Sequence, residues 1–236
     1  MRYDRSTKTL IFSGFTGVPG YYVGGYGEKF CVYAEEDLTV TGTANFTINV
    51  SGPSYGIASA GVLTIAEGAD LTINVQSDAL EGYGGVIING GRVDVTGRLG
   101  TGISATSGDG LVMNGGTVKA SGGCFGIDAQ NSSIVVKGGT LSVFSSGEDD
   151  RYAGIRLLSG GTINVKGGVL ASGSHCSISY AGKWLEHESG DWYTGTVGQG
   201  KTYYYNLEFM PDDGYTFGGA GTGWRRWNPC TAKTAA

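Results

Sequence analysis

A short phrase of alternating apolar residues around a Gly-Gly pair recurs along this chain and restricts the folds open to it. Three clear copies are VIINGGRVDV, LVMNGGTVKA and IVVKGGTLSV, and looser copies precede them. We place the starts of successive copies at Leu38, Leu63, Val86, Leu111, Ile134 and about residue 156, where LSGGTINV is taken as a distorted copy. Steps of roughly 22 to 25 residues are typical of one turn of a solenoid, not of a propeller blade or a helical pair.

Each copy holds two alternating apolar and polar runs, which predict short half-buried strands, and the Gly-Gly pair allows a corner between them. A third run, such as Gly102-Ile103-Ser104, follows in several copies. Three strands and three corners per turn predict an all-β fold, a right-handed parallel β-helix. Two inward rows are expected to form its core, namely Val93, Val118, Leu141 and Ile163, and Val95, Ala120, Val143 and Val165.

The composition of the sequence changes near residue 183, where the glycine-rich repeat ends and aromatic residues become frequent. We therefore divide the chain into a β-helix over residues 1–182 and a small β-rich unit over residues 183–236. A strand within residues 3–12 is expected to cover the first turn. The second unit is too small to be a secure independent domain, so we expect it to cap the solenoid or dock on its side, with a loose tail from residue 218.

Charge and cysteine usage exclude several classes of partner. The formal net charge is −5 and the basic residues are scattered, which argues against nucleic acid and against anionic membranes. No apolar run is long enough to span a bilayer, and no signal peptide is recognised. The register places Cys31, Cys124 and Cys176 on well-separated turns, so free thiols are expected there. We predict no metal site and no cofactor.

The phrases YDRSTKTLIFSGFTG, FCVYAEEDLTVTG and FGIDAQNSSIVVKGGTLSV resemble secreted and surface β-helix proteins of anaerobic, often gut-dwelling, Firmicutes. One similar branch is the clostridial carbohydrate-binding β-helix family, described as binding cellulose and acidic sugars with calcium. The resemblance implies a carbohydrate ligand and an extracellular or cell-surface location. Calcium is not carried over, because Tyr55, Thr101 and Phe125 stand where that branch tends to have Asp. The segment GKTYYYNLEFMPDDGYTF also resembles an immunoglobulin-like module.

An aromatic series at one corner is the first candidate ligand site. Each member stands one or two residues before a glycine that opens a strand, and the members are Tyr55, Tyr83, Phe125 and Tyr152. Exposed aromatic rings at repeat spacing can stack on sugar rings, although the same residues could simply pad the corner. Asp128 is added as a polar ligand-binding residue that could project from the third strand, with Glu81 nearby.

An aliphatic row on the outer side of the first strand is the second candidate surface. Its members are Ile87, Val112, Val135 and Leu157. Such a patch is rarely left bare on a soluble monomer. The favoured interpretation is that the C-terminal unit lies over it, and the alternative is a dimer or partner interface.

These features favour a noncatalytic extracellular module that binds polysaccharide along one side of the solenoid. A structural stalk or adhesin module with a protein partner is the alternative. A polysaccharide lyase or hydrolase is third, because no motif brings carboxylates together with His or Arg, and the acidic loop Glu148-Asp149-Asp150 suits a solvated turn.

Overall fold

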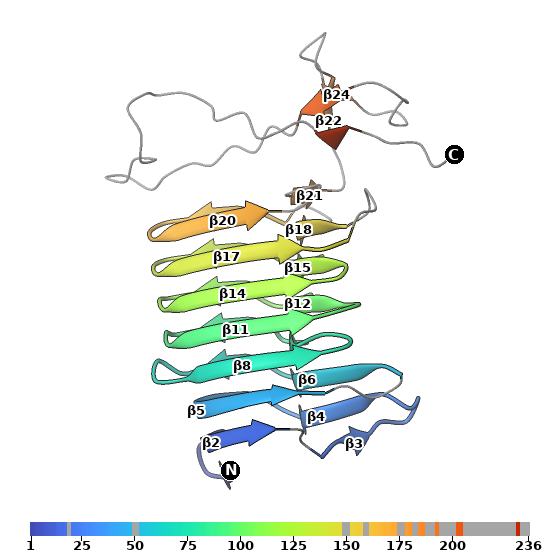
Figure 1. Ribbon diagram of the computed structural model, residues 1–236. Helices are drawn as coiled ribbons and strands as arrows, with labels where there is room; N and C mark the ends of the chain where they lie inside the picture. Colours follow the sequence, from blue (N-terminus) through green and yellow to red (C-terminus); the bar gives the residue numbers. More distant parts are fainter. Residues whose placement is uncertain are drawn as a thin grey trace.

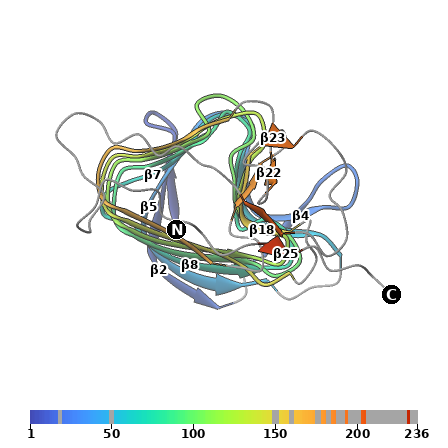
Figure 2. The ribbon, with the colours of Figure 1, turned by 90° about the horizontal axis from the view of Figure 1, so that it is seen from above.

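The computed structural model describes residues 1–17, 20–48, 52–147, 152–157 and 161–173, and the short segments 178–180, 184–186, 192–193, 202–204 and 230–231. These residues form an all-β solenoid of parallel strands (Figure 1), which confirms the predicted fold class. Within these residues there is no helix long and apolar enough to cross a membrane. Seen from above, the chain passes from β8 through the wall of β18 and back towards β7 counter-clockwise as it rises, so the coil is right-handed (Figure 2).

Each turn has three faces, as the three apolar runs predict. The first face contains β7 (Leu63–Ile65), β10 (Val86–Ile88), β13 (Leu111–Met113), β16 (Ile134–Val136) and β19 (Ile163–Val165). The second contains β8 (Asp70–Val75), β11 (Arg92–Gly97), β14 (Thr117–Gly122), β17 (Thr140–Ser145) and β20 (Val169–Gly173). The strand β5 (Leu38–Thr47) runs through both faces and joins them into one sheet.

The third face is a separate eight-stranded sheet. It contains β3 (Tyr22–Val23), β4 (Lys29–Ala34), β6 (Ser54–Ser59), β9 (Leu80–Gly82), β12 (Thr101–Ser104), β15 (Phe125–Ala129), β18 (Ala153–Leu157) and β21 (Ile178–Tyr180). All of its pairings are parallel except that of β3 with β4. Figure 2 shows this wall bending towards the axis of the solenoid between its two corners.

The N-terminal residues form two strands where one was expected. β1 (Arg2–Asp4) pairs antiparallel with β2 (Thr9–Gly17), and β2 then pairs parallel with β5. A turn at residues 5–8 separates the two strands, with Lys8 at a positive φ of 50°. The rings of Phe12, Phe15 and Phe46 meet at this end with centroids 6.2 to 6.4 Å apart and fill the base of the core.

The described C-terminal segments form a four-stranded antiparallel sheet. Its strands are β22 (Trp184–Glu186), β23 (Trp192–Tyr193), β24 (Thr202–Tyr204) and β25 (Cys230–Thr231). The division of the chain near residue 183 into two units stays a prediction.

Successive Gly-Gly phrases lie directly over one another, as the repeat predicts. Val93, Val118 and Leu141 are in register on β11, β14 and β17, and each is at most 1% exposed. Gly91, Gly116 and Gly139 all have φ near +80 to +90°, the left-handed region that disfavours residues with a Cβ. A methyl group at Gly116 would also lie 2.6 Å from the carbonyl oxygen of Gly91 on the turn below. Conformation and close approach therefore both require glycine at this corner.

The predicted register is wrong for the last turn. Leu141 pairs with Leu170, and Ile163 instead continues the column of Ile134 on the first face. The true corner is Gly167-Gly168, because Gly168 has φ +77° and stacks against Gly139, whereas Gly161 precedes β19. Ile134 and Ile163 are 29 residues apart in the sequence, so this turn is longer than those before it, and the expected spacing led to the earlier Gly-Gly pair.

Cys31 and Cys124 are free thiols, as expected. Burial raises the pKa of Cys31 to about 12, so its thiol stays protonated at neutral pH. The Cys124 thiol donates to the carbonyl oxygen of Leu99 at 3.0 Å. Cys176 lies outside the described residues, as do both histidines, and Cys230 is described only in its backbone.

Candidate functional site

The outer wall of the eight-stranded sheet carries most of the polar and aromatic candidates. One outward row on this wall passes through Tyr33, Ala58, Glu81, Ser104, Asp128 and Arg156, one residue per turn. The residues before them point inward, and Ile57, Leu80, Ile103, Ile127 and Ile155 are at most 1% exposed. Strand alternation therefore holds the core on one side while the opposite side changes residue type at every turn.

A second row on the same wall begins where each strand enters the sheet. It contains Phe30, Tyr55, Thr101, Phe125 and Ala153, and Asp78 occupies the turn between Tyr55 and Thr101. Phe125 and Ala153 form a small buried cluster with Tyr152 and Cys124, separate from the main core. In β6, β12, β15 and β18 the next residue is glycine. A Cβ at Gly56 would lie 2.2 Å from the Ala79 carbonyl oxygen and 2.8 Å from the Ile73 side chain, so there is no room for a side chain at this position.

Three tyrosines gather around Ala58 and Glu81 in the lower part of this wall, and we name these five residues the tyrosine site. The side chains of Tyr33 and Tyr83 are 41% and 47% exposed, and Tyr55 is half-buried. Phe30 supports the site from the side, with its ring stacked on Tyr55 at 4.8 Å and tilted against Tyr33 at 5.1 Å. Ala58 faces outward yet is fully buried, so larger neighbours cover it.

The Glu81 carboxyl lies partly buried among these rings. The Tyr83 hydroxyl donates a hydrogen bond to it, while Glu81 Oε2 is buried without a hydrogen-bond partner. Burial, together with the negative charge of Asp78, raises the pKa of Glu81 to about 7. Burial and the Glu81 charge raise the pKa of Tyr83 to about 12. The carboxyl therefore changes charge near neutral pH while the tyrosine hydroxyls keep their protons.

Asp78 is held in place by the next turn of the solenoid. The Thr101 backbone N–H donates to Asp78 Oδ1 at 2.7 Å, and burial is the main cause that raises the pKa of this carboxyl. The negative charge of Asp78 also contributes to the raised pKa of Tyr55, after burial. Asp78 thus adds negative charge next to the tyrosine site, and its hydrogen bond to Thr101 fixes the position of its carboxylate.

Asp128 and Arg156 form an ion pair on neighbouring turns higher on the wall, which corrects the expectation that no carboxylate meets an arginine on adjacent turns. Arg156 Nε donates to Asp128 Oδ1 at 2.9 Å, and Arg156 Nη2 donates to Oδ2. Gln130 Nε2 adds a third donor at 3.1 Å. The Asp128 side chain is 6% exposed, so this carboxylate is buried and fully engaged. A carboxylate in this state acts as an anchor for the wall more readily than as a ligand group.

The structure brings together only part of the predicted aromatic series. Tyr55 and Phe125 share a row, and Tyr152 contacts Phe125 edge-on at 6.1 Å. Tyr83 instead follows β9 at the opposite end of the strand, so the four residues do not form one corner row. Phe125 is 6% exposed beneath Arg156 and Tyr152, which corrects the expectation that its ring is available for stacking. Glu81 and Asp128 lie in one row, two turns apart.

The predicted aliphatic row on the first face is present, but its fourth residue is not the predicted one. Ile87, Val112 and Val135 are in register on the first face and half-buried, and Asn164 continues their row. Leu157 is fully buried in β18 and belongs to the core, so its assignment to this surface is wrong. The error has the same origin as the shifted last turn. The acidic loop Glu148-Asp149-Asp150 lies outside the described residues.

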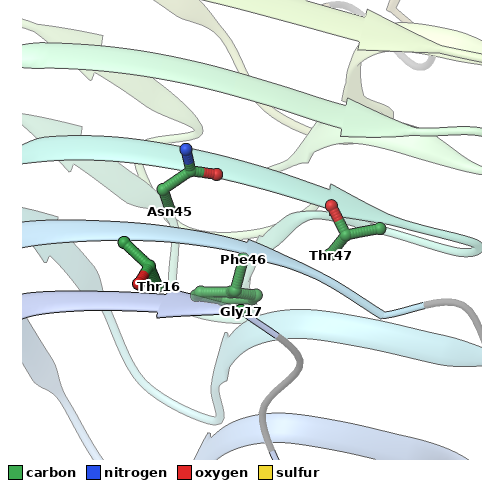
Figure 3. Close-up of a pocket in the computed structure, with 5 residues that line it drawn as sticks. All are labelled: Thr16, Gly17, Asn45, Phe46 and Thr47. Atoms are coloured by element: carbon green, nitrogen blue, oxygen red, sulfur yellow. The ribbon is translucent and has the colours of Figure 1, made fainter.

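Two features escaped the sequence analysis. Tyr33 belongs to the outward row of the tyrosine site, where it pairs with Ala58 on the following turn, and no repeat signal in the sequence marks it. Phe144 on β17 is 49% exposed beside a shallow hollow lined by Lys119, Ser121 and Ser142. Another shallow hollow lies at the ends of β2 and β5 (Figure 3), where Thr16, Asn45 and Thr47 surround the buried Phe46. Neither hollow gathers titratable groups as the tyrosine site does.

The described residues contain no group of three His, Cys, Asp or Glu side chains arranged to hold a metal ion. Comparisons with curated proteins and with solved structures gave no match. A family model described as "Carbohydrate-binding domain-containing protein" matches residues 21–199, which include nearly all of the solenoid and the whole tyrosine site. The chain therefore belongs to this family of carbohydrate-binding domain-containing proteins.

Proposed function

We propose that the protein is a noncatalytic module that binds polysaccharide at the tyrosine site, outside the cell or at its surface. One observation carries the proposal: two half-exposed tyrosine rings and a third beside them surround a carboxyl group on a single wall. An aromatic ring offers an apolar face to the C–H groups of a sugar, and its hydroxyl offers a hydrogen bond at the edge. Membership of a carbohydrate-binding family supports the same class of ligand.

The arrangement of the wall suits an extended ligand. Tyr33 and Glu81 lie two turns apart in one row, so their backbones are separated by about twice the strand spacing of 4.8 Å. A polymer lying along the axis can meet several such groups, and each added contact is then formed at a high effective concentration. Shallow contacts of modest individual strength can therefore add up to useful affinity.

The carboxylates of this wall support a noncatalytic role. Glycoside hydrolysis generally needs one carboxyl as acid and a second as base or nucleophile. Asp128 is neutralised by Arg156, and Asp78 accepts from Thr101, so neither stands free beside Glu81. Release of shortened products from a bound polymer would overturn this part of the proposal.

A structural or adhesin module with a protein partner is the second candidate. The observation that favours it is the half-buried aliphatic row of Ile87, Val112 and Val135 on the first face, away from the tyrosine site. Rows of this kind are typical of protein interfaces, whereas a sugar platform would need aromatic rings and hydrogen-bonding groups.

Glycan binding with matched tyrosine variants tests the proposal. The protein is screened on a glycan array, and affinity for the best ligand is measured by calorimetry for Tyr33→Ala, Tyr83→Ala and Tyr3→Ala. Tyr3 is the control, because it is 46% exposed on β1, in the other sheet. We expect each site variant to weaken binding by about tenfold, the value of one stacking contact, and the control to bind normally. Equal binding by all three variants, or no glycan ligand at all, would contradict the proposal.

A further inference from the structure

The two ends of the outer wall already show how this protein pairs cations with aromatic rings. At the upper end the Arg156 guanidinium lies 3.9 Å from the centroid of Phe125. At the lower end Lys29 Nζ lies 5.5 Å from the centroid of Tyr21. Between them, no cation of the described chain lies over Tyr33, Tyr55 or Tyr83. The middle of the wall thus has the aromatic faces without the positive charge.

The same region has an excess of negative charge. Neither Asp78 nor Glu81 forms an ion pair with any residue that the structure describes. The Arg156 charge slightly favours the charged form of Asp78, but Arg156 is committed to Asp128 in the next turns up the wall. Each carboxyl is destabilised in its charged form by burial, and Glu81 also by the charge of Asp78. A positive group held against the tyrosine faces would relieve both carboxyls at once.

We infer that the tyrosine site takes a sugar bearing a protonated amine, so that its preferred ligand is a polymer containing de-N-acetylated hexosamine units. The inference rests on the proposed function and specifies its ligand. The sugar ring stacks on the exposed tyrosines, and the ammonium group lies between their faces and the carboxyls of Glu81 and Asp78. A neutral sugar leaves these carboxyls uncompensated. An acidic sugar brings a third negative charge to the same place, so it is disfavoured.

The test compares four oligosaccharides of equal length and β-1,4 linkage, built from glucosamine, N-acetylglucosamine, glucose and glucuronic acid. Affinities for the unmodified protein are measured by calorimetry at neutral pH and at two salt concentrations. We expect the glucosamine oligomer to bind at least about ten times more tightly than the glucose oligomer. Added salt should reduce this ratio, because it screens charge–charge attraction and leaves stacking in place.

Two charge-removing variants locate the preference. Glu81→Gln should bring the ratio of glucosamine to glucose affinity close to one, because it removes the charge and keeps the shape. Glu67→Gln is the control, since Glu67 lies at the corner between the first and second faces, and it should leave the ratio unchanged. Thermal unfolding checks that both variants fold. If Glu81→Gln does not fold, the comparison of the four oligosaccharides on the unmodified protein is sufficient to test the inference.

The outcomes separate this inference from the proposed function. Glucose, N-acetylglucosamine or glucuronic acid oligomers that bind as tightly as glucosamine would overturn the inference and leave carbohydrate binding standing. No binding of any glycan would overturn the proposed function itself. A glucosamine preference that survives in Glu81→Gln would also overturn the inference, because another part of the surface would then provide it.

Discussion

Arg156 covers Phe125 with its guanidinium and, with the same group, neutralises Asp128 on the turn below. One side chain thus shields an outward aromatic ring and satisfies a buried carboxylate. Replacing it by alanine leaves Asp128 charged and 6% exposed without a partner. Loss of one partner from a buried pair costs about 3 kcal/mol of unfolding free energy, and we expect Arg156→Ala to lose this amount in urea denaturation at neutral pH.

A surface ion pair provides the control for this prediction. Arg92 lies 3.3 Å from Asp70, and both side chains are more than half exposed. Such pairs contribute less than about 1 kcal/mol, so Arg92→Ala should change stability little. Equal losses in the two variants would show that Asp128 does not depend on Arg156.

The raised pKa of Glu81 predicts a specific dependence of stability on pH. In the unfolded chain this carboxyl has its ordinary pKa of 4.5, and in the fold it has a pKa of about 7. Between these values the folded state holds a proton that the unfolded state has released, so the contribution of Glu81 to the unfolding free energy falls as pH rises. Above pH 7 the loss is complete.

Glu81→Gln removes this dependence and isolates it from other titrating groups. We expect the variant to match the natural protein near pH 4 and to be more stable by roughly 3 kcal/mol near pH 8. Urea denaturation of both proteins across this range measures the difference. A constant difference at every pH would mean that Glu81 keeps its ordinary pKa in the fold.

The two glycines of one corner should respond very differently to alanine. Gly116 has φ +90° and faces the Gly91 carbonyl oxygen, whereas the nearest atom to a methyl group at Gly115 would be 3.5 Å away. We expect Gly116→Ala to lose more than about 2 kcal/mol of unfolding free energy. Gly115→Ala should stay within about 0.5 kcal/mol of the natural protein. Similar values for both would contradict the stacked corner.

The aliphatic row provides a test of what lies over the first face. We expect residues 183–236 to cover it, and Val112→Asp would then place a charge in an apolar contact and lower the unfolding free energy by about 2 kcal/mol. Thr64→Asp is the control from the same outward row, one turn below Ile87. Size-exclusion chromatography distinguishes the alternative, because a dimer interface would dissociate. A stable Val112→Asp monomer would show that the row is simply exposed.

The fold could be predicted because every turn repeats the same physical requirements. Each turn needs a glycine with positive φ, two alternating strands and a third short run. Each of these leaves a clear pattern in the sequence, and a parallel β-helix is the architecture that accounts for all three. The last turn failed because the pattern has a second Gly-Gly pair seven residues earlier, and only pairing partners distinguish Gly161 from Gly168. The shift carried Leu157 from the core to a surface on which it does not lie.

The candidate site was less predictable because outward residues have no periodic constraint. Tyr55 and Tyr83 could be chosen from residue type alone. Their neighbours could not be predicted, because these depend on which strand positions pair between successive turns. Phe125 was expected to be exposed because the sequence does not show that Arg156, one turn higher, folds over it. Tyr33 was missed because it stands at the position of Ala58, Glu81 and Ser104 on later turns, where the repeat has no shared residue type.

Each strand of the wall contributes one residue to an aliphatic inward row and one to a variable outward row. This arrangement determines how the outer surface changes when the number of turns changes. Adding or removing one complete turn would shift the tyrosines relative to the Arg156–Asp128 pair by a single strand spacing and leave both groups internally intact. The distance between the tyrosine site and this ion pair would then change in fixed increments of one strand spacing. The spacing between groups on this wall is thus set by the number of turns, independently of which chemical groups each turn displays.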